Sequence, residues 1–215
     1  MKLPFDEIET VLVDIDGTLT LCADGHEALE RPIEQHLSRL CEREVSLPAE
    51  KDPCSREVLQ LLGVSIDDLF CSLREDLSRH TVVPEDAVFF LHEMKRRRLP
   101  VFTASTNSRF FCNLKLSLGV RADADSADGI TGYFPGDSFG HPMGKFAPDY
   151  FEKILQKGNF SPEHTLMIGN EVEHDLIPAR RAGIKHIVIV NRNGKETICP
   201  EDGAMHVHSL RELFQ

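Results

Sequence analysis

Short apolar runs alternate with amphipathic segments along most of this chain. The runs are typical of strands buried on both faces, because they lack the regular polar alternation of a half-exposed strand. These expected strands cover residues 11–13, 101–105, 165–168 and 186–190. Between them, apolar spacings of three and four predict helices that begin after Pro84 and that cover residues 110–118, 149–156 and 176–182. The alternation predicts an α/β fold, a Rossmann-like parallel sheet with helices on both faces.

One stretch, residues 21–80, interrupts this alternation with helical patterns and no expected strand. Helices are expected over residues 28–43, 56–62 and 66–77. Ser65 is expected to cap the last of them, because the acidic residues that follow it would then lie in the first helical turn. We therefore expect a core domain formed by residues 1–20 and 81–215, and a helical domain formed by residues 21–80.

The charge balance restricts the partners that the protein could bind. Its 215 residues include 24 basic and 35 acidic side chains, a net charge of −11. A field of that sign repels nucleic acid, so we expect no nucleic-acid partner. No apolar stretch approaches the roughly 18 residues that span a bilayer, and the first residues do not resemble a secretory signal. The six cysteines form no CxxC pair, which indicates reduced thiols. We expect no membrane association and a cytoplasmic location.

The sequence directly after the first expected strand carries two carboxylates, Asp14 and Asp16, followed by Gly17. The carboxyl edge of a parallel sheet is where open α/β folds bind ligands. Gly17 permits a sharp turn, so Asp16 can leave the face that Asp14 occupies. Two anionic groups this close repel each other unless a cation lies between them or one holds a proton. The pair therefore indicates a divalent cation or a division of acid and base roles.

Polar residues also follow the next two core strands. Ser105, Thr106 and Asn107 could bind phosphate oxygens or could serve only to cap the following helix. The segment from Asn170 to Asp175 follows the strand over residues 165–168 and contains Glu171. A glycine followed by several oxygen ligands suits Mg²⁺, which prefers octahedral oxygen coordination and keeps several waters. The alternative is an acidic loop that caps the next helix.

These motifs resemble, in kind and order, those of the haloacid dehalogenase-like (HAD) hydrolases, many of which are Mg²⁺-dependent phosphatases. Asp-Ile-Asp-Gly-Thr-Leu-Thr, which begins at Asp14, looks like the first motif of the family. The resemblance implies that Asp14 is a nucleophile that forms an aspartyl-phosphate and that Asp16 is the general acid/base. It implies that Ser105, or Thr106 in the alternative register, binds the transferring phosphoryl group. Lys145, followed shortly by a proline, would be the lysine that neutralises this group.

The resemblance also implies a metal ion and a cap. Mg²⁺ would be bound by Asp14 and the Asp16 backbone carbonyl, together with Asn170, Glu171 or Asp175 of the fourth motif. The family commonly has an Asp where this chain has Asn170, which offers an oxygen without a charge. This difference predicts a weaker metal site. The helical insertion would be the cap that closes over the active site.

We therefore predict a Mg²⁺-dependent phosphatase that hydrolyses a small phosphorylated metabolite, a phosphomonoester, through an aspartyl-phosphate. Two alternatives remain open. A phosphomutase acting on a sugar phosphate would use the same residues but would return the phosphoryl group to a second substrate oxygen. A catalytically weak member would bind a phosphorylated ligand or a protein, and Asn170 favours this alternative. A dehalogenase is disfavoured, because displacement of halide needs no leaving-group acid such as Asp16.

Overall fold

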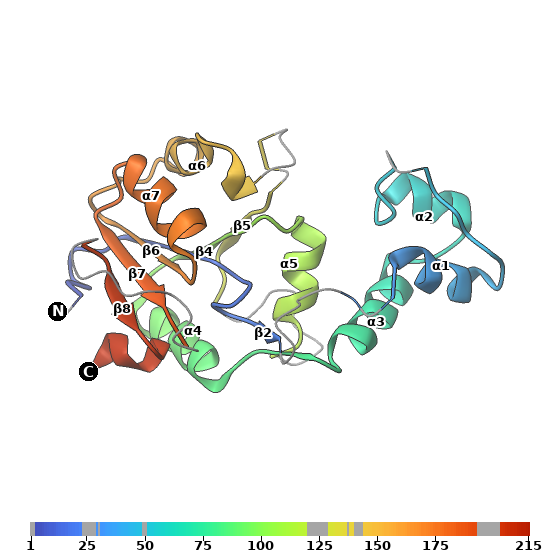
Figure 1. Ribbon diagram of the computed structural model, residues 1–215, viewed down its shortest axis with the longest axis horizontal. Helices are drawn as coiled ribbons and strands as arrows, with labels where there is room; N and C mark the ends of the chain where they lie inside the picture. Colours follow the sequence, from blue (N-terminus) through green and yellow to red (C-terminus); the bar gives the residue numbers. More distant parts are fainter. Residues whose placement is uncertain are drawn as a thin grey trace. The chain divides into compact units, whose positions relative to one another are not determined.

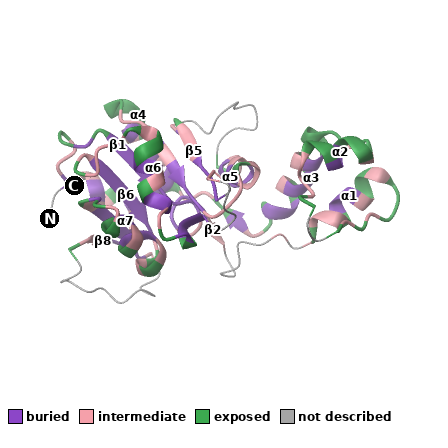
Figure 2. Cartoon of the chain, turned by 90° about the horizontal axis from the view of Figure 1, so that it is seen from above, coloured by how far each residue is buried: buried purple, intermediate pink, exposed green. Residues whose placement is uncertain are grey.

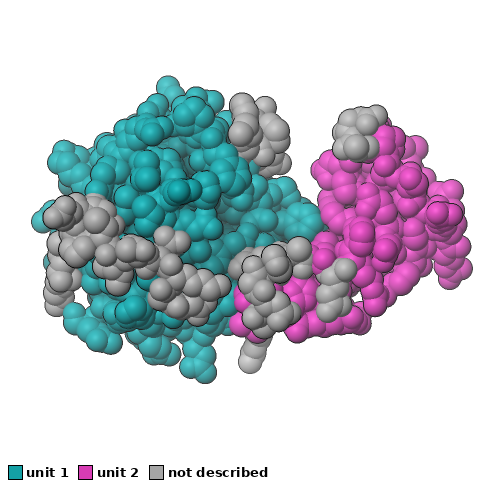
Figure 3. All heavy atoms as spheres, viewed as in Figure 1, with its two compact units in different colours: residues 1–21, 83–215 teal, residues 22–82 magenta. Residues whose placement is uncertain are grey.

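The computed structural model describes residues 3–22, 29, 31–48, 51–119, 129–136, 138–139, 144–192 and 203–215. The chain forms two compact units (Figure 3), one from Met1–Leu21 with Val83–Gln215 and the other from Cys22–Val82. The first unit carries the main sheet with its covering helices. The second carries helices α1, α2 and α3.

A six-stranded sheet runs through the first unit in the order β5-β4-β1-β6-β7-β8 (Figure 1). All of its pairings are parallel. Its strands are β1 (Thr10–Val13), β4 (Val101–Ala104), β5 (Gly132–Phe134), β6 (Thr165–Gly169), β7 (His186–Val190) and β8 (Met205–Val207). Val13 is in register with Thr103 of β4 and Ile168 of β6, so these three strands end together. The predicted fold class, a Rossmann-like α/β fold, is confirmed.

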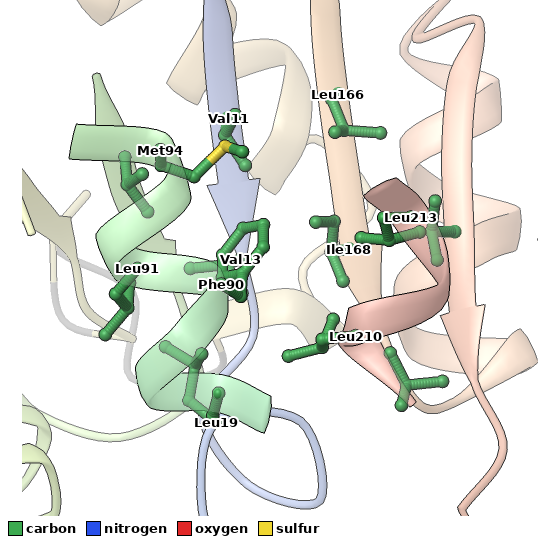
Figure 4. Packing of buried hydrophobic residues seen from close by; sticks show 14 of the residues in the cluster. Val11, Val13, Leu19, Phe90, Leu91, Met94, Leu166, Ile168, Leu210 and Leu213 are labelled. Carbon is green, nitrogen blue, oxygen red and sulfur yellow. The ribbon is translucent and has the colours of Figure 1, made fainter. Parts of the chain in front are cut away.

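Helices cover both faces of this sheet. On one face lie α4 (Glu85–Arg97), α5 (Arg109–Leu116) and the 3₁₀ helix η4 (Leu210–Phe214), and on the other lie α6 (Tyr150–Gly158) and α7 (Ile177–Arg181). Val11 and Val13 pack among the residues of α4 and η4 (Figure 4), whereas Leu12 packs with residues of α6 and α7. The central strands are buried on both sides (Figure 2). Their continuous apolar sequence follows from this position.

Two strands of the sheet were not among those expected from the sequence, namely β5 and β8 at its two edges. Each has three residues, too few for an alternating or apolar pattern to be distinguished from a loop. Residues Val172–Leu176 form a single π-helical turn, η2, before α7 begins. Pro178 lies in the first turn of α7, the only place where the predicted helix could tolerate it.

The smaller unit contains α1 (Ile33–Cys41), α2 (Arg56–Leu62) and α3 (Ile66–Leu77). Ser65 caps α3 as predicted, because its side chain accepts a hydrogen bond from Asp68 N. The first helix was expected from residue 28, but residues 23–28 and 30 lie outside the described part of the chain, and α1 follows Pro32. The expectation of no strand in residues 21–80 was wrong, because β2 (Leu21–Cys22) pairs with β3 (Thr81–Val82) in a separate two-stranded sheet.

A buried polar cluster joins α1 to α3. His36 Nδ1 lies 2.8 Å from Ser72 Oγ, and His36 Nε2 lies 3.1 Å from Asp76 Oδ2. All three side chains are buried. Because buried polar groups are stable only when they are hydrogen-bonded, this cluster fixes the pairing of the two helices.

Across the described ranges, none of the helices combines the length and the apolar character needed to cross a bilayer.

Candidate active site

The candidate site lies at the carboxyl edge of the sheet, where β1, β4 and β6 end. Asp14 directly follows β1, Ser105 follows β4 and Asn170 follows β6. Lys145 lies in η1, a short 3₁₀ helix over Gly144–Phe146, and Asp175 lies in η2. Residues separated by as many as 161 positions in the sequence therefore meet because parallel strands end on the same side of the sheet.

Asp14 and Lys145 form a buried ion pair. Lys145 Nζ lies 2.5 Å from Asp14 Oδ1, and the two residues are 7% and 3% exposed. Burial raises the pKa of Asp14 to about 7, with Lys145 opposing this effect and the Asp175 and Asp16 carboxylates adding to it. Burial alone would lower the pKa of Lys145, but the carboxylates of Asp14 and Asp175 outweigh it and raise that pKa above its usual range. Lys145 is therefore a permanent cation next to a carboxylate that is poorly solvated.

Asp175 fixes Lys145 from the other side. Its Oδ1 accepts from Lys145 Nζ at 2.7 Å, and its Oδ2 accepts from the backbone N–H groups of Asn170 and Glu171 at 2.9 and 3.0 Å. A Cβ on Gly169 would lie 2.2 Å from the Asp175 carboxyl group, so only glycine leaves room for it. Asp175 was predicted as a metal ligand. In the structure both of its oxygens accept hydrogen bonds, and its part in metal binding stays a prediction.

The side-chain amide of Asn170 completes a group of three polar atoms. The amide atom in the Oδ1 position lies 2.8 Å from the Asp16 backbone oxygen and 3.1 Å from Asp14 Oδ2. With nitrogen in this place, the amide donates to both oxygens. With oxygen there, three oxygens converge, an arrangement that is stable only around a cation. Gly17, with a φ of 78°, permits this approach, because a Cβ on it would lie 2.3 Å from the amide.

This oxygen set fits a hard divalent cation such as Mg²⁺, which binds one or two carboxylates and completes its shell with water. Within the described part of the chain, no three His, Cys, Asp or Glu side chains are grouped as a metal site. The candidate ligands here are instead one carboxylate, one backbone carbonyl and one amide. Glu171, predicted as a further ligand, contributes its backbone N–H to Asp175, while its half-exposed carboxylate lies 3.9 Å from His174 Nε2.

Asp16 has a different set of partners from Asp14. Its Oδ2 accepts a hydrogen bond from Asn107 Nδ2 at 2.5 Å. Its Oδ1 lies 2.5 Å from Lys115 Nζ and 3.4 Å from Thr20 Oγ1. The Asp16 side chain is 32% exposed, whereas that of Asp14 is 4% exposed. The two carboxylates, although two residues apart, thus occupy different environments, as the turn at Gly17 was predicted to allow.

Ser105 is held in place by both its main chain and its side chain. Its N–H donates to Tyr150 Oη at 3.1 Å, and the Tyr150 hydroxyl also contacts the Phe134 carbonyl at the end of β5. Its hydroxyl accepts from the backbone N–H and the side-chain amide of Asn107, at 3.2 and 3.0 Å. Asn107, predicted to bind substrate, therefore connects Ser105 to Asp16. The main chain of Thr106, the alternative register, packs closely on Gly136.

Thr18, Lys115 and Tyr150, like Thr20, contact site residues and were not predicted. Thr18 Oγ1 lies 3.4 Å from Asp14 Oδ2 and 3.4 Å from Asn170 Oδ1, and Lys115 and Tyr150 contact Asp16 and Ser105 as described above. Thr18 lies within the first motif, so its place in the sequence could have indicated it. Lys115 and Tyr150 lie within amphipathic helices, where nothing in the sequence separates them from ordinary helix residues.

The sequence profile of the haloacid dehalogenase-like hydrolases matches residues 8–183, which include the whole site. The chain belongs to this family. No curated protein matches it significantly.

Solved structures with low sequence identity share the fold of this HAD-like hydrolase. YfnB of Bacillus subtilis, in a structure bound to magnesium, is 20% identical with a TM-score of 0.59, over 96% of this chain and 97% of that one. A HAD phosphatase from Thermococcus onnurineus is 19% identical with a TM-score of 0.60, over 96% of both chains. A HAD family hydrolase from Deinococcus radiodurans, with bound phosphate and sodium, is 21% identical with a TM-score of 0.58, over 96% of this chain and 93% of that one. At these identities the likeness concerns the fold.

Proposed function

We propose that this HAD-like hydrolase is a Mg²⁺-dependent phosphatase that acts on small phosphomonoesters through a phosphorylated Asp14. The observation that carries the proposal is the pair of carboxylates with separate cations. Asp14 is buried against Lys145 at 2.5 Å, while Asp16 is more exposed and lies 2.5 Å from Lys115. Two carboxyl groups in different environments are suited to different roles, one as nucleophile and one as acid and base.

In the first step an oxygen of Asp14 attacks phosphorus. The bond from phosphorus to the ester oxygen breaks, and its electron pair leaves with that oxygen, which takes the proton of the Asp16 carboxyl group. Lys145 and the Ser105 hydroxyl stabilise the charge on the transferring phosphoryl oxygens. The alcohol departs, and an acyl phosphate remains on Asp14.

In the second step a water molecule attacks the phosphorus of phospho-Asp14 and transfers a proton to the Asp16 carboxylate. The bond between phosphorus and the Asp14 oxygen breaks, which frees the Asp14 carboxylate and inorganic phosphate. Asp16 is then protonated again for the next cycle. The two proton transfers are the reverse of each other, so one side chain serves both steps.

Mg²⁺ would be held by Asp14 Oδ2, the Asp16 backbone oxygen and the Asn170 amide oxygen, and would reduce the repulsion between the anionic nucleophile and the phosphate. The magnesium in the B. subtilis neighbour and the phosphate in the D. radiodurans neighbour support this choice of ion and ligand. The predicted cap role of the helical unit and a cytoplasmic location belong to the same proposal.

The proposal is tested with a panel of phosphorylated metabolites and one aryl phosphate, in MgCl₂ and in excess EDTA. We expect release of inorganic phosphate with MgCl₂ only. Acid quenching during turnover, followed by peptide mass spectrometry, should find one phosphoryl group on Asp14. If an isomeric phosphate ester forms and no phosphate is released, the protein is a mutase and not a phosphatase. If phosphorylated ligands bind tightly without turnover, it is a binding protein.

Replacement of Asn170 by Asp is expected to strengthen Mg²⁺ binding and to destabilise the metal-free protein. The new carboxylate would lie close to Asp14 Oδ2, where the amide atom is now 3.1 Å away, and would repel it unless a cation intervenes. An added ligand charge should improve the affinity about tenfold, or about 1.4 kcal/mol. Calorimetric titration with MgCl₂ and thermal melting in EDTA measure the two effects.

The exposed Gln156 of α6 provides the matched control, because Gln156→Glu adds the same charge away from the site. This variant should bind Mg²⁺ like the parent protein. Equal Mg²⁺ affinities for Asn170→Asp and the parent protein would show that the amide is not a ligand.

A further inference from the structure

Lys115 is a buried lysine with no part in the reaction as described so far. It lies in the last turn of α5, ten residues after Ser105, and is 4% exposed. Its ammonium group reaches Asp16 Oδ1 at 2.5 Å. It therefore contacts the side chain to which we assign the proton transfers.

Its burial sets Lys115 apart from Lys95 and Lys157, the exposed lysines in the last turns of the α-helices α4 and α6. A lysine in a last turn usually extends its charge into solvent, where it interacts favourably with the helix dipole. Lys95 does so in the last turn of α4, where it is exposed. Burial of an ammonium group is costly unless a carboxylate and further hydrogen bonds compensate for it. The inward course of Lys115 is thus explained by its pairing with Asp16 and not by helix capping.

The two oxygens of Asp16 are held by two different elements. Lys115 of α5 contacts Oδ1, and Asn107, from the loop after β4, donates to Oδ2 at 2.5 Å. Donors on both oxygens fix the rotation of a carboxyl group as well as its position. Loss of Lys115 would remove the shorter of two contacts to Oδ1, since Thr20 Oγ1 lies 3.4 Å from that atom, and would hold the group's rotation less firmly. A misplaced proton donor slows catalysis even when the substrate still binds.

Each carboxylate of the first motif also has its own cation. Lys145 contacts Asp14 and Asp175, and Lys115 contacts Asp16. The cation that contacts the acid/base thus comes from α5, whereas the cation that contacts the nucleophile comes from η1.

We propose that Lys115 is a positioning residue that orients the Asp16 carboxyl group toward the leaving-group oxygen; the role rests on the proposed phosphatase function. Its effect should depend on the leaving group. A phenolate that is a poor leaving group needs the proton of Asp16, whereas a strongly activated phenolate departs without it. A purely structural lysine would affect both substrates alike.

The experiment compares kcat/KM for phenyl phosphate and 2,4-dinitrophenyl phosphate, because kcat/KM reports the steps up to departure of the phenol. In Lys115→Met we expect a loss of about 10- to 100-fold with phenyl phosphate and less than about threefold with the dinitrophenyl ester. Lys115→Arg, which keeps the charge, should recover most of the loss. Lys95→Met is the matched control and should resemble the parent protein with both esters. If Lys115→Met does not fold, Lys115→Gln takes its place.

Equal losses with the two esters, or no loss with phenyl phosphate, would overturn the role of Lys115 while the parent protein remained an active phosphatase. If the parent protein hydrolyses neither ester in MgCl₂, the proposed function falls and the role of Lys115 falls with it. The activity of the parent protein therefore distinguishes the two failures.

Discussion

Asp14→Asn is expected to abolish phosphate release while the protein remains folded. The amide cannot attack phosphorus, so no covalent intermediate forms, and removal of a nucleophile costs about 10⁴-fold or more in kcat. The fold should tolerate the change, because burial already disfavours the charged form of Asp14, whose pKa is raised to about 7. Lys145 also keeps Asp175 as a partner at 2.7 Å. Phosphate release and thermal melting measure the two results.

Asp6→Asn is the matched control, since Asp6 is an exposed residue of the same unit. It should leave both activity and melting temperature unchanged. Retention of more than about 1% of the parent activity by Asp14→Asn would contradict the nucleophilic role, because covalent catalysis cannot proceed without the nucleophile.

The central part of the fold could be predicted because it depends on residues that the sequence marks clearly. Strand β1 must be apolar on both faces, since α4 and η4 cover one side and α6 the other. Its paired strands β4 and β6 have the same requirement, and all three end at polar residues. The edge strands β5 and β8 are short and have no such requirement. A short edge strand is stabilised by its pairing with the neighbouring strand. A local sequence pattern carries no information about that pairing.

The same distinction applies to the candidate site. Asp14, Ser105 and Asn170 follow buried strands, so their convergence follows from parallel topology alone. Lys115 and Tyr150 reach the site from helices, and their inward direction depends on how those helices pack. The bonds of Asp175 to two backbone N–H groups likewise depend on the π-helical turn η2, which has no sequence signature. The residues after the strands could thus be predicted from topology and Lys145 from the family resemblance, whereas Lys115 and Tyr150, which helix packing places, were missed.

Lys145→Met is expected to impair both catalysis and stability, unlike Asp14→Asn. Loss of the cation that faces the transferring phosphoryl group should reduce kcat by about 10³-fold. Two carboxylates, Asp14 Oδ1 at 2.5 Å and Asp175 Oδ1 at 2.7 Å, would lose their shared partner in a site that is almost fully buried. Removal of one member of a buried ion pair typically lowers the free energy of unfolding by about 3–5 kcal/mol. Urea denaturation and phosphate release measure the two effects.

The decrease in stability should lie toward the lower end of this range, because the remaining groups can adapt. Asp14 can take up a proton, since burial already raises its pKa, and Asp175 keeps its bonds to the N–H groups of Asn170 and Glu171. Lys153→Met is the matched control: Lys153 is a half-exposed lysine that pairs with Asp149 at 2.8 Å. Its loss should cost less than about 1 kcal/mol, as is usual for a surface ion pair. Equal unfolding free energies for the two variants would mean that the ion pairs of Lys145 with Asp14 and Asp175 do not stabilise the site. Lys145 would then not be the group that keeps Asp14 in place.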